Sequence, residues 1–471
     1  MLHISTRGEA SPLTFTDALL AGLARDGGLY VPEAWPKLSA DTIASFAGRP
    51  YAEVAKAVLG ALIGDEIPAS ELGRMVDEAY ATFRHPAICP LVQIGDNLFV
   101  QELFHGPTLA FKDVAMQLLG RLMDYVLAAR GQRATIVGAT SGDTGSAAVA
   151  AFAGSSRVDV FILYPHGRVS EVQRRQMTSV PDANVHAIAI DGTFDDAQAA
   201  VKAMFSNPRF RDEMQLSGIN SINWARVAAQ AVYYFTAAVA LGSPHRPVSF
   251  AVPTGNFGDV LAGYVAKQMG LPIDRLVVAT NANDILARTI ATGTYEVRGV
   301  VPTTSPSMDI QVSSNFERLL FEAYGRDPAA IRGLMGSLAQ SGSFAIAPEP
   351  LARIRRDFEA AAVPEDEVAD EINRTWREVG YLLDPHTAIG TRAARRHLSA
   401  DPATPVVALS TAHPAKFPDA VERAAGIRPA LPPHLSDLMD RPERVTRLPN
   451  EIGAIEDFIR AEARAVAGQA A

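Results

Sequence analysis

The hydrophobic pattern of the chain changes character near residue 91. Before that point, apolar residues recur at helical spacing, most clearly over 15–23 and 51–63, with glycine and proline marking turns. After it, short β-rich apolar runs alternate with amphipathic stretches. The pattern predicts strands over 134–138, 158–164, 185–190, 248–252, 276–280 and 406–409. It predicts helices from 113 to 130 and up to 153, then over 170–177, 193–205, 222–241, 259–269 and 284–292, from 315 to about 398, and from about 451.

This alternation predicts an α/β fold with mostly parallel sheet and helices on both faces. The strand–helix rhythm restarts near residue 247, so we expect two α/β lobes with a cleft between them. We expect a mostly helical N-terminal region over 1–90, one lobe over 91–246, a second lobe with a helical insertion over 247–428, and a tail with one helix over 429–471.

The stretch from Phe104 to Asp113 offers the first candidate chemistry. Its Gly-Pro pair predicts a loop, and helical periodicity begins at Asp113, so Lys112 lies where a loop enters a helix. Apolar residues directly upstream disfavour a charged lysine, which lowers its pKa and frees the amine as a nucleophile. The alternative is a surface lysine whose stem lies along an apolar patch.

Three polar loops each follow a predicted strand: 138–145, 253–259 and 410–414. In open α/β sheets, ligands bind beyond the carboxyl ends of the strands. The first two loops run into helices, so their amides suit a carboxylate or a phosphate, although a capped helix explains either loop alone. Neither a Walker loop nor a GxGxxG fingerprint is present in the second loop. In the third, His413 is either a base or a packed loop histidine.

Composition excludes several other classes of protein. A formal charge of −9 argues against nucleic-acid binding, and no apolar run approaches the length of a membrane span. The N-terminus carries no signal-peptide pattern, and a single cysteine, Cys89, excludes an internal disulfide, so we expect a cytoplasmic protein. No cluster of residues has metal-ligand spacing, so we expect no metal. The oligomeric state is left open.

Four segments together resemble those of threonine synthases, which are fold-type II pyridoxal phosphate enzymes. They are FHGPTLAFKD at 104–113, SGDTG at 141–145, the glycine loop at 253–259, and TAHPAKFPDAV at 411–421, and the resemblance begins with STRG at 5–8. It implies that Lys112 is the catalytic lysine and carries pyridoxal 5′-phosphate as an imine. The cofactor-binding residues it implies are Asp143, Gly255, Asn256, Phe257, Gly258 and Thr411. The substrate-binding residues it implies are Thr140, Ser141, Gly142 and Thr144.

The implied reaction converts O-phospho-L-homoserine and water to L-threonine and phosphate, with Lys112 as the base. One residue departs from the usual fold-type II pattern, in which an asparagine bonds the ring hydroxyl of the cofactor. This chain has Asp143, whose carboxylate must be protonated, paired or turned away from a phenolate. For the substrate phosphate, the candidates are Lys416, Arg318 and the 303–309 loop.

Two alternatives remain open at the level of sequence. Another fold-type II lyase, such as a serine/threonine dehydratase or a threonine-synthase-like phospho-lyase, would share Lys112 and the glycine loop but release a 2-oxo acid. A non-enzymatic phosphate-binding module would use the lysine only to pair an anion.

Overall fold

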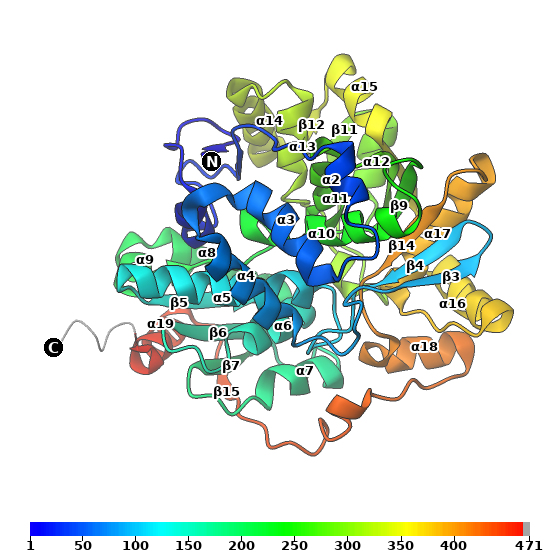
Figure 1. Cartoon of the computed structure of the whole chain (residues 1–471). Coiled ribbons are helices and arrows are strands. Elements are labelled where there is room, and N and C mark those ends of the chain that lie inside the picture. The colour runs from blue at the N-terminus through cyan, green and yellow to red at the C-terminus, as the bar shows by residue number, and fades with distance from the viewer. Residues whose placement is uncertain (465–471) are drawn as a thin grey trace.

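In a computed structural model that describes residues 1–464, two mainly parallel sheets lie side by side with helices around them (Figure 1). The first sheet has five strands, in the order β15-β7-β6-β5-β8, and all of its pairs are parallel. Its strands are β5 Ala134–Ala139, β6 Val158–Pro165, β7 Val185–Ile190, β8 Leu216–Ser217 and β15 Thr446–Leu448. Every residue of β6 is buried, as expected of a continuous apolar strand with helices on both faces.

The second sheet has six strands, in the order β13-β10-β9-β14-β4-β3. Its pairs are parallel except for the antiparallel β3–β4 pair at one edge. Its strands are β3 Leu91–Gly95, β4 Leu98–Glu102, β9 Val248–Pro253, β10 Ile273–Thr280, β13 Phe358–Ala362 and β14 Val406–Ser410. The candidate loops at 103–112, 254–257 and 411–413 therefore follow the carboxyl ends of three neighbouring or near-neighbouring strands of one sheet.

The helices surround these sheets, and α10 lies in the interior. Nearly every residue of α10 (Trp224–Ala240) is buried, which explains why its sequence is apolar on all sides. The remaining helices near the core of the two sheets are α5 Lys112–Arg130, α6 Asp143–Phe152, α7 Glu171–Thr178, α8 Phe194–Ser206, α9 Pro208–Glu213, α11 Gly258–Gln268 and α17 Pro385–Ala400. More peripheral helices are α12 Ile285–Thr292, α13 Phe316–Ala323, α14 Pro328–Ser341, α15 Pro348–Asp357, α16 Glu365–Val379, α18 Pro418–Ala425 and α19 Ile452–Glu462.

The amino-terminal region packs its helices on the body of the protein. Its helices are α1 Phe15–Ala21, α2 Ala40–Ala44, α3 Tyr51–Ile63 and α4 Ala69–Tyr80. Figure 1 shows α3 and α4 beside α10 and α5, and their apolar residues belong to the same core. This region also contains an antiparallel pair, β1 His3–Ser5 with β2 Tyr30–Pro32.

The α/β fold class and the predicted strands are confirmed, with two departures. The helix-rich segment predicted from 315 to 398 also contains β12 Ser343–Ala345, paired with β11 Thr294–Glu296, and the edge strand β13. Alanine and glutamate dominate β13, and pairing with β10 overrides their helical preference.

The residue ranges of the lobes remain a prediction, to which the strand pairing adds two details. The β3–β4 hairpin, within the range expected for the first lobe, pairs with β14 of the six-stranded sheet. The tail contributes β15 to the five-stranded sheet. Across residues 1–464, no helix combines the length and the apolar character needed to cross a membrane.

Candidate active site

The lysine segment is joined to the loop after β14 by backbone hydrogen bonds. Phe111 N donates to Thr411 O at 2.8 Å, His413 N donates to Leu109 O at 3.0 Å, and Ala110 bridges Ala412. Because these bonds immediately precede Lys112, the first residue of α5, they fix the start of the helix beside the carboxyl end of β14.

Asp113 holds the loop before Lys112 in shape. Its buried carboxylate accepts hydrogen bonds from Thr108 N at 2.7 Å and from Thr108 Oγ1 at 2.8 Å. A Cβ on Gly106 would lie 2.4 Å from Asp113 Cβ, so only glycine allows this close approach. The Gly-Pro-Thr and Lys-Asp parts of the segment are therefore one folded unit around Lys112.

Lys112 lies in an environment that weakens its protonated form. Only 8% of the residue is exposed, and burial lowers the pKa of its amine to about 8. Asp143 acts in the opposite direction, with its Oδ2 3.7 Å from Lys112 Nζ, while Arg226 and Lys416 add to the lowering. The amine is thus suited to nucleophilic attack on an aldehyde near neutral pH.

A pH dependence follows for attachment of pyridoxal phosphate to the cofactor-free protein. With a pKa of about 8, about one Lys112 amine in ten is neutral at pH 7, against about one in 3000 for an ordinary lysine. We expect the attachment rate, followed by absorbance, to rise with pH and to level off above about pH 8. Because Asp143 raises this pKa, Asp143→Asn should move the midpoint lower. A midpoint near that of a free lysine would contradict the geometry.

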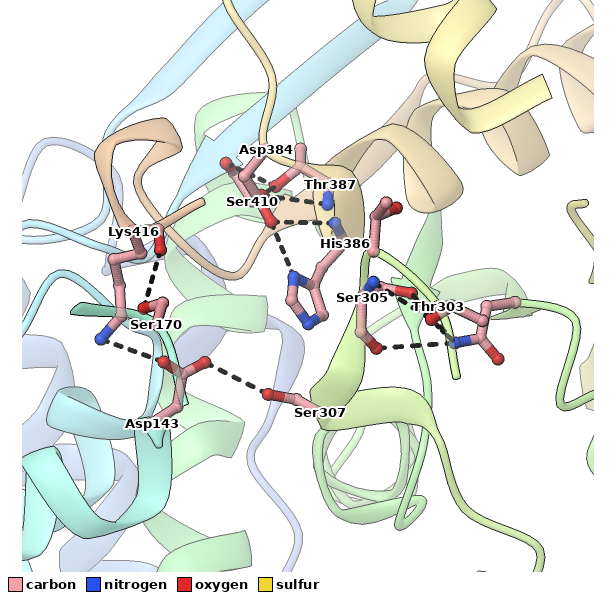
Figure 2. Close-up of polar contacts among 12 residues, drawn as sticks. Asp143, Ser170, Thr303, Ser305, Ser307, Asp384, His386, Thr387, Ser410 and Lys416 are labelled. Atoms are coloured by element: carbon pink, nitrogen blue, oxygen red, sulfur yellow. Dashed lines mark hydrogen bonds and ion pairs between the residues drawn. The ribbon is translucent and has the colours of Figure 1, made fainter. Parts of the chain in front are cut away.

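Asp143, the first residue of α6, is buried and paired. Its Oδ1 lies 3.0 Å from Lys416 Nζ, and its Oδ2 accepts from Ser307 Oγ at 3.3 Å (Figure 2). Its Oδ1 also accepts from Gln173 Nε2 at 2.9 Å. Burial alone would raise the pKa of this carboxyl, but Lys416 and then Lys112 hold it well below its usual range. Of the three states open to Asp143, the structure shows the paired one.

The loop around Asp143 is built by Thr140 and Gly142. Thr140 Oγ1 accepts from Gly142 N and Gly145 N, both at 2.9 Å, and Gly142 has φ +136°, which a side chain rarely adopts. Thr140 is buried, whereas Ser141 and Thr144 are partly exposed. Thr140 therefore shapes the loop, and Ser141 and Thr144 are the hydroxyls of this loop that face accessible space.

The three candidates for the substrate phosphate are placed differently. Lys416 is fully buried, and Arg318 is almost so, with its guanidinium donating to Tyr30 O, Ile222 O and Asn315 Oδ1. Both cations are therefore used inside the protein. The 303–309 loop also reaches the site, since its Ser307 contacts Asp143.

The loop at 254–257 has the geometry of an anion cup. Gly255 O accepts from Ser313 Oγ at 2.7 Å, and Asn256 O accepts from Asn315 N at 3.1 Å, so these carbonyls turn toward residues 313–315. Phe257 has φ +62° and caps α11. The amides from Gly255 to Gly258 find no acceptor among the described residues. Free amides at a helix N-terminus fit the phosphate of pyridoxal phosphate.

Gly255→Ala should weaken cofactor binding. Its Cβ would lie 3.0 Å from Ser307 O and 3.3 Å from Met308 Cα, so the cup or the neighbouring segment must shift. We expect the Kd for pyridoxal phosphate to rise roughly tenfold to a hundredfold, as for a lost charged hydrogen bond. Equilibrium dialysis measures this, with Gly333→Ala in helix α14 as the control because a Cβ there meets nothing within 4 Å. An unchanged Kd would contradict the assignment of this loop to the cofactor phosphate.

Thr411 and His413 lie at the end of β14 beside the lysine segment. Thr411 is buried, and its carbonyl accepts from Phe111 N. His413 caps the short helix at 414–416, with its Nδ1 accepting from Ala415 N at 3.1 Å, and burial lowers the pKa of its ring to about 4. The capping bond favours the interpretation of His413 as a packed loop histidine.

One histidine near Asp143, His386, was not predicted to lie at the site. His386 at the start of α17 bonds Asp384 Oδ2 through Nδ1 at 2.8 Å, and Thr387 of the same turn contacts Ser410 (Figure 2). The Nε2 atom of His386 is buried without a partner among the described residues. The order Asp-Pro-His-Thr at 384–387 is a helix-capping pattern that could have identified the start of α17. The pattern does not show that this helix start lies at the site.

A second residue near the site that the sequence analysis did not single out is Asn281, which follows β10. Its amide donates to Thr303 Oγ1 and Ser305 Oγ at 2.9 Å and to Asp309 Oδ1 at 2.8 Å. Asn281 therefore fixes the 303–309 loop between the anion cup and Asp143.

The fold has two mainly parallel sheets. The site combines a lysine of lowered pKa with a loop whose backbone amides are free to bind a phosphate. Together these features are those of a pyridoxal phosphate enzyme of fold type II. The family model "Pyridoxal-phosphate dependent enzyme" matches residues 88–344, more than half of the chain. The models "Threonine synthase N terminus" and "Threonine synthase, C-terminal" match residues 2–80 and 387–459. The chain belongs to the threonine synthase family.

Relatives support this assignment over the full length. The chain is 52% identical to a threonine synthase of Pseudomonas aeruginosa over 98% of both chains. It is 36% identical to the human protein "Threonine synthase-like 2", over 95% of this chain and 93% of that protein. The structure of a pyridoxal-phosphate-bound threonine synthase from Brucella melitensis matches with a TM-score of 0.96 and 62% identity, over 98% of this chain and all of that one.

Proposed function

We propose that this protein converts O-phospho-L-homoserine and water to L-threonine and inorganic phosphate. Full-length similarity to threonine synthases supports the activity, and the observation that carries the site is the buried Lys112 amine 3.7 Å from Asp143. When bound, pyridoxal phosphate supplies an electron sink for negative charge at the substrate α-carbon.

The chain's own residues then have distinct roles. Lys112 would hold the cofactor covalently until the substrate amine displaces it. The freed Lys112 amine, with its lowered pKa, would then be a competent base for the α-proton. The amides of Gly255, Asn256, Phe257 and Gly258 hold the cofactor phosphate, and the Thr411 hydroxyl faces the pyridine nitrogen. A hydroxyl at that position does not force the ring to be protonated.

We assign the substrate carboxylate to the loop at 140–144. Ser141 and Thr144 offer hydroxyls, and Gly142 lets the backbone approach the substrate carboxylate closely. Thr140 shapes the loop by accepting hydrogen bonds from the amides of Gly142 and Gly145. An ionised Asp143 has no N–H to donate to the ring hydroxyl of the cofactor, as an asparagine would. Held by Lys416 and Gln173, Asp143 instead places a negative charge beside Lys112. For the substrate phosphate we assign the 303–309 loop at Ser307, whose amide has no acceptor among the described residues. The neighbouring amides and threonine hydroxyls of the loop already donate within the protein.

The test is a product analysis of the purified holoenzyme with O-phospho-L-homoserine in ¹⁸O-labelled water. We expect threonine and phosphate in equal amounts, with the label in the threonine hydroxyl. Phosphate with a 2-oxo acid and ammonia would instead identify a phospho-lyase or a dehydratase-like enzyme. A protein that gains no visible absorbance band on addition of pyridoxal phosphate would be a phosphate-binding module only.

We also propose that the protein works in the cytoplasm. Cys89 is buried, and burial raises the pKa of its thiol, so it is an inert core residue rather than half of a disulfide. A chain with a single buried thiol fits a reducing compartment. Fractionation of cells and detection of the protein with an antibody checks this.

A further inference from the structure

A cluster of side chains that can bind a metal ion lies at the carboxyl end of helix α17, outside the candidate active site. His397 lies in the last turn of α17, Asp401 caps it, and Asp274 lies near the start of β10. The carboxyl end of β10 leads instead to Asn281 and the active site, so the cluster lies at the opposite end of that strand. One ring nitrogen of His397 and one carboxylate oxygen from each aspartate all lie within 4.8 Å of one another.

The histidine is held as metal-binding histidines are held. His397 Nδ1 is 2.8 Å from Glu359 Oε2, and only 7% of the residue is exposed. Its other nitrogen, Nε2, is buried and has no hydrogen-bond partner among the described residues. A carboxylate on one ring nitrogen fixes the tautomer and directs the lone pair of the other nitrogen to a metal. A buried Nε2 without a partner is otherwise costly.

We propose that His397, Asp274 and Asp401 form a zinc site, with Glu359 orienting the histidine. One imidazole nitrogen and two carboxylate oxygens suit Zn²⁺, whereas Ca²⁺ and Mg²⁺ prefer oxygen ligands alone. Both aspartates are partly exposed, which gives an ion access from solvent. Ligand oxygens in a tetrahedral site lie closer together than 4.8 Å, so small side-chain shifts complete the set.

The other groups around the cluster do not neutralise it fully. Lys267 Nζ bonds the backbone oxygen of Asp274 at 3.2 Å, and Arg275 Nε is 3.7 Å from Glu359 Oε1. Asp401 also accepts from the amides of Ala403 and Thr404.

A metal there would tie three elements together. It would join the carboxyl end of α17 to the amino end of β10 and, through Glu359, to the edge strand β13. We assign it a stabilising role on the sheet that carries the active-site loops, with no part in the reaction. Residue spacing predicted no metal site, because the fold brings Asp274 to His397 and Asp401 from a distant part of the chain.

The test is a zinc titration of the pyridoxal-phosphate-loaded enzyme by calorimetry, with zinc content measured after desalting. We expect one Zn²⁺ per chain and a rise in Tm on saturation, with no rise from Mg²⁺. His397→Gln and Asp274→Asn should each weaken zinc binding at least about tenfold, and Glu359→Gln by about tenfold to a hundredfold. His186→Gln is the matched control, since His186 Nε2 is also buried without a described partner but lies outside the cluster.

Two results would overturn the proposal. One is zinc binding that His397→Gln and Asp274→Asn leave unchanged, which would place the ion elsewhere. The other is no zinc bound by the wild-type protein, which would leave these side chains as a hydrogen-bonded network only. Should His397→Gln fail to fold, the partly exposed Asp274→Asn variant decides between these results.

Discussion

Replacing Lys112 with alanine is expected to lower kcat for threonine formation by at least about 1000-fold. The variant loses both the covalent link to the cofactor and the base at the α-carbon, and proton transfer alone contributes about 10²–10⁴-fold. The cup at residues 255–258 is untouched, so pyridoxal phosphate should still bind, but without covalent attachment. The visible band of the lysine-bound cofactor should therefore be absent.

Borohydride reduction followed by mass spectrometry measures the link directly. In the wild-type protein, the reduced cofactor should be found on the peptide that contains Lys112, and in Lys112→Ala on no peptide. Lys202→Ala is the control, because Lys202 is an exposed lysine on α8 and should keep full activity. A cofactor adduct on another lysine, or activity retained without Lys112, would contradict the assignment.

Lys416→Met is expected to destabilise the holoenzyme by about 3–5 kcal/mol, the cost of breaking a buried ion pair. Lys416 Nζ donates to Thr108 O at 2.7 Å and Gln176 Oε1 at 3.0 Å and pairs with Asp143 at 3.0 Å, so its three donors are used. Without it, the cationic partner left to Asp143 among residues 1–464 is the more distant Lys112.

A double-mutant cycle with Asp143→Asn isolates the pair. We expect Asp143→Asn with Lys416→Met to be less destabilising than the sum of the single changes, by about 1–3 kcal/mol in urea unfolding. Arg428→Met is the control, because that cation pairs with Asp419 and Glu422 on the exposed surface. If Lys416 bound the substrate phosphate instead, its replacement would raise the KM for O-phospho-L-homoserine at nearly unchanged stability.

Much of the candidate site could be predicted from the sequence because local patterns indicate it. Lys112 lies at a predicted loop–helix junction, and the structure begins α5 at that residue and ends it before Gly131. The anion cup follows a predicted strand, and its glycines and helix start are local features. Residue order also placed each loop after a strand, and parallel strands bring their carboxyl ends to one edge.

The state of Asp143 and the functions of Lys416 and Arg318 could not be derived in this way. The pairing of Asp143 depends on a lysine 273 positions later in the chain and on Gln173 and Ser307, which come from other elements. A lysine buried with three acceptors and an exposed lysine have the same sequence signal, because burial is a property of the packed chain. Asn281 and the Asp384–His386 pair were missed for the same reason.

Residue patterns and motif wording identified the α/β fold class and the family and predicted the lysine and the cup, because periodicity, turn residues and motif wording are local properties of the chain. Tertiary structure alone decided which charges meet. It joined the lysine segment to Thr411, paired Asp143 with Lys416, added the β3–β4 hairpin to the six-stranded sheet, and brought Asp274 to His397. Each of these contacts joins residues far apart in sequence, and only packing and burial determine whether such residues meet and which charge state they keep.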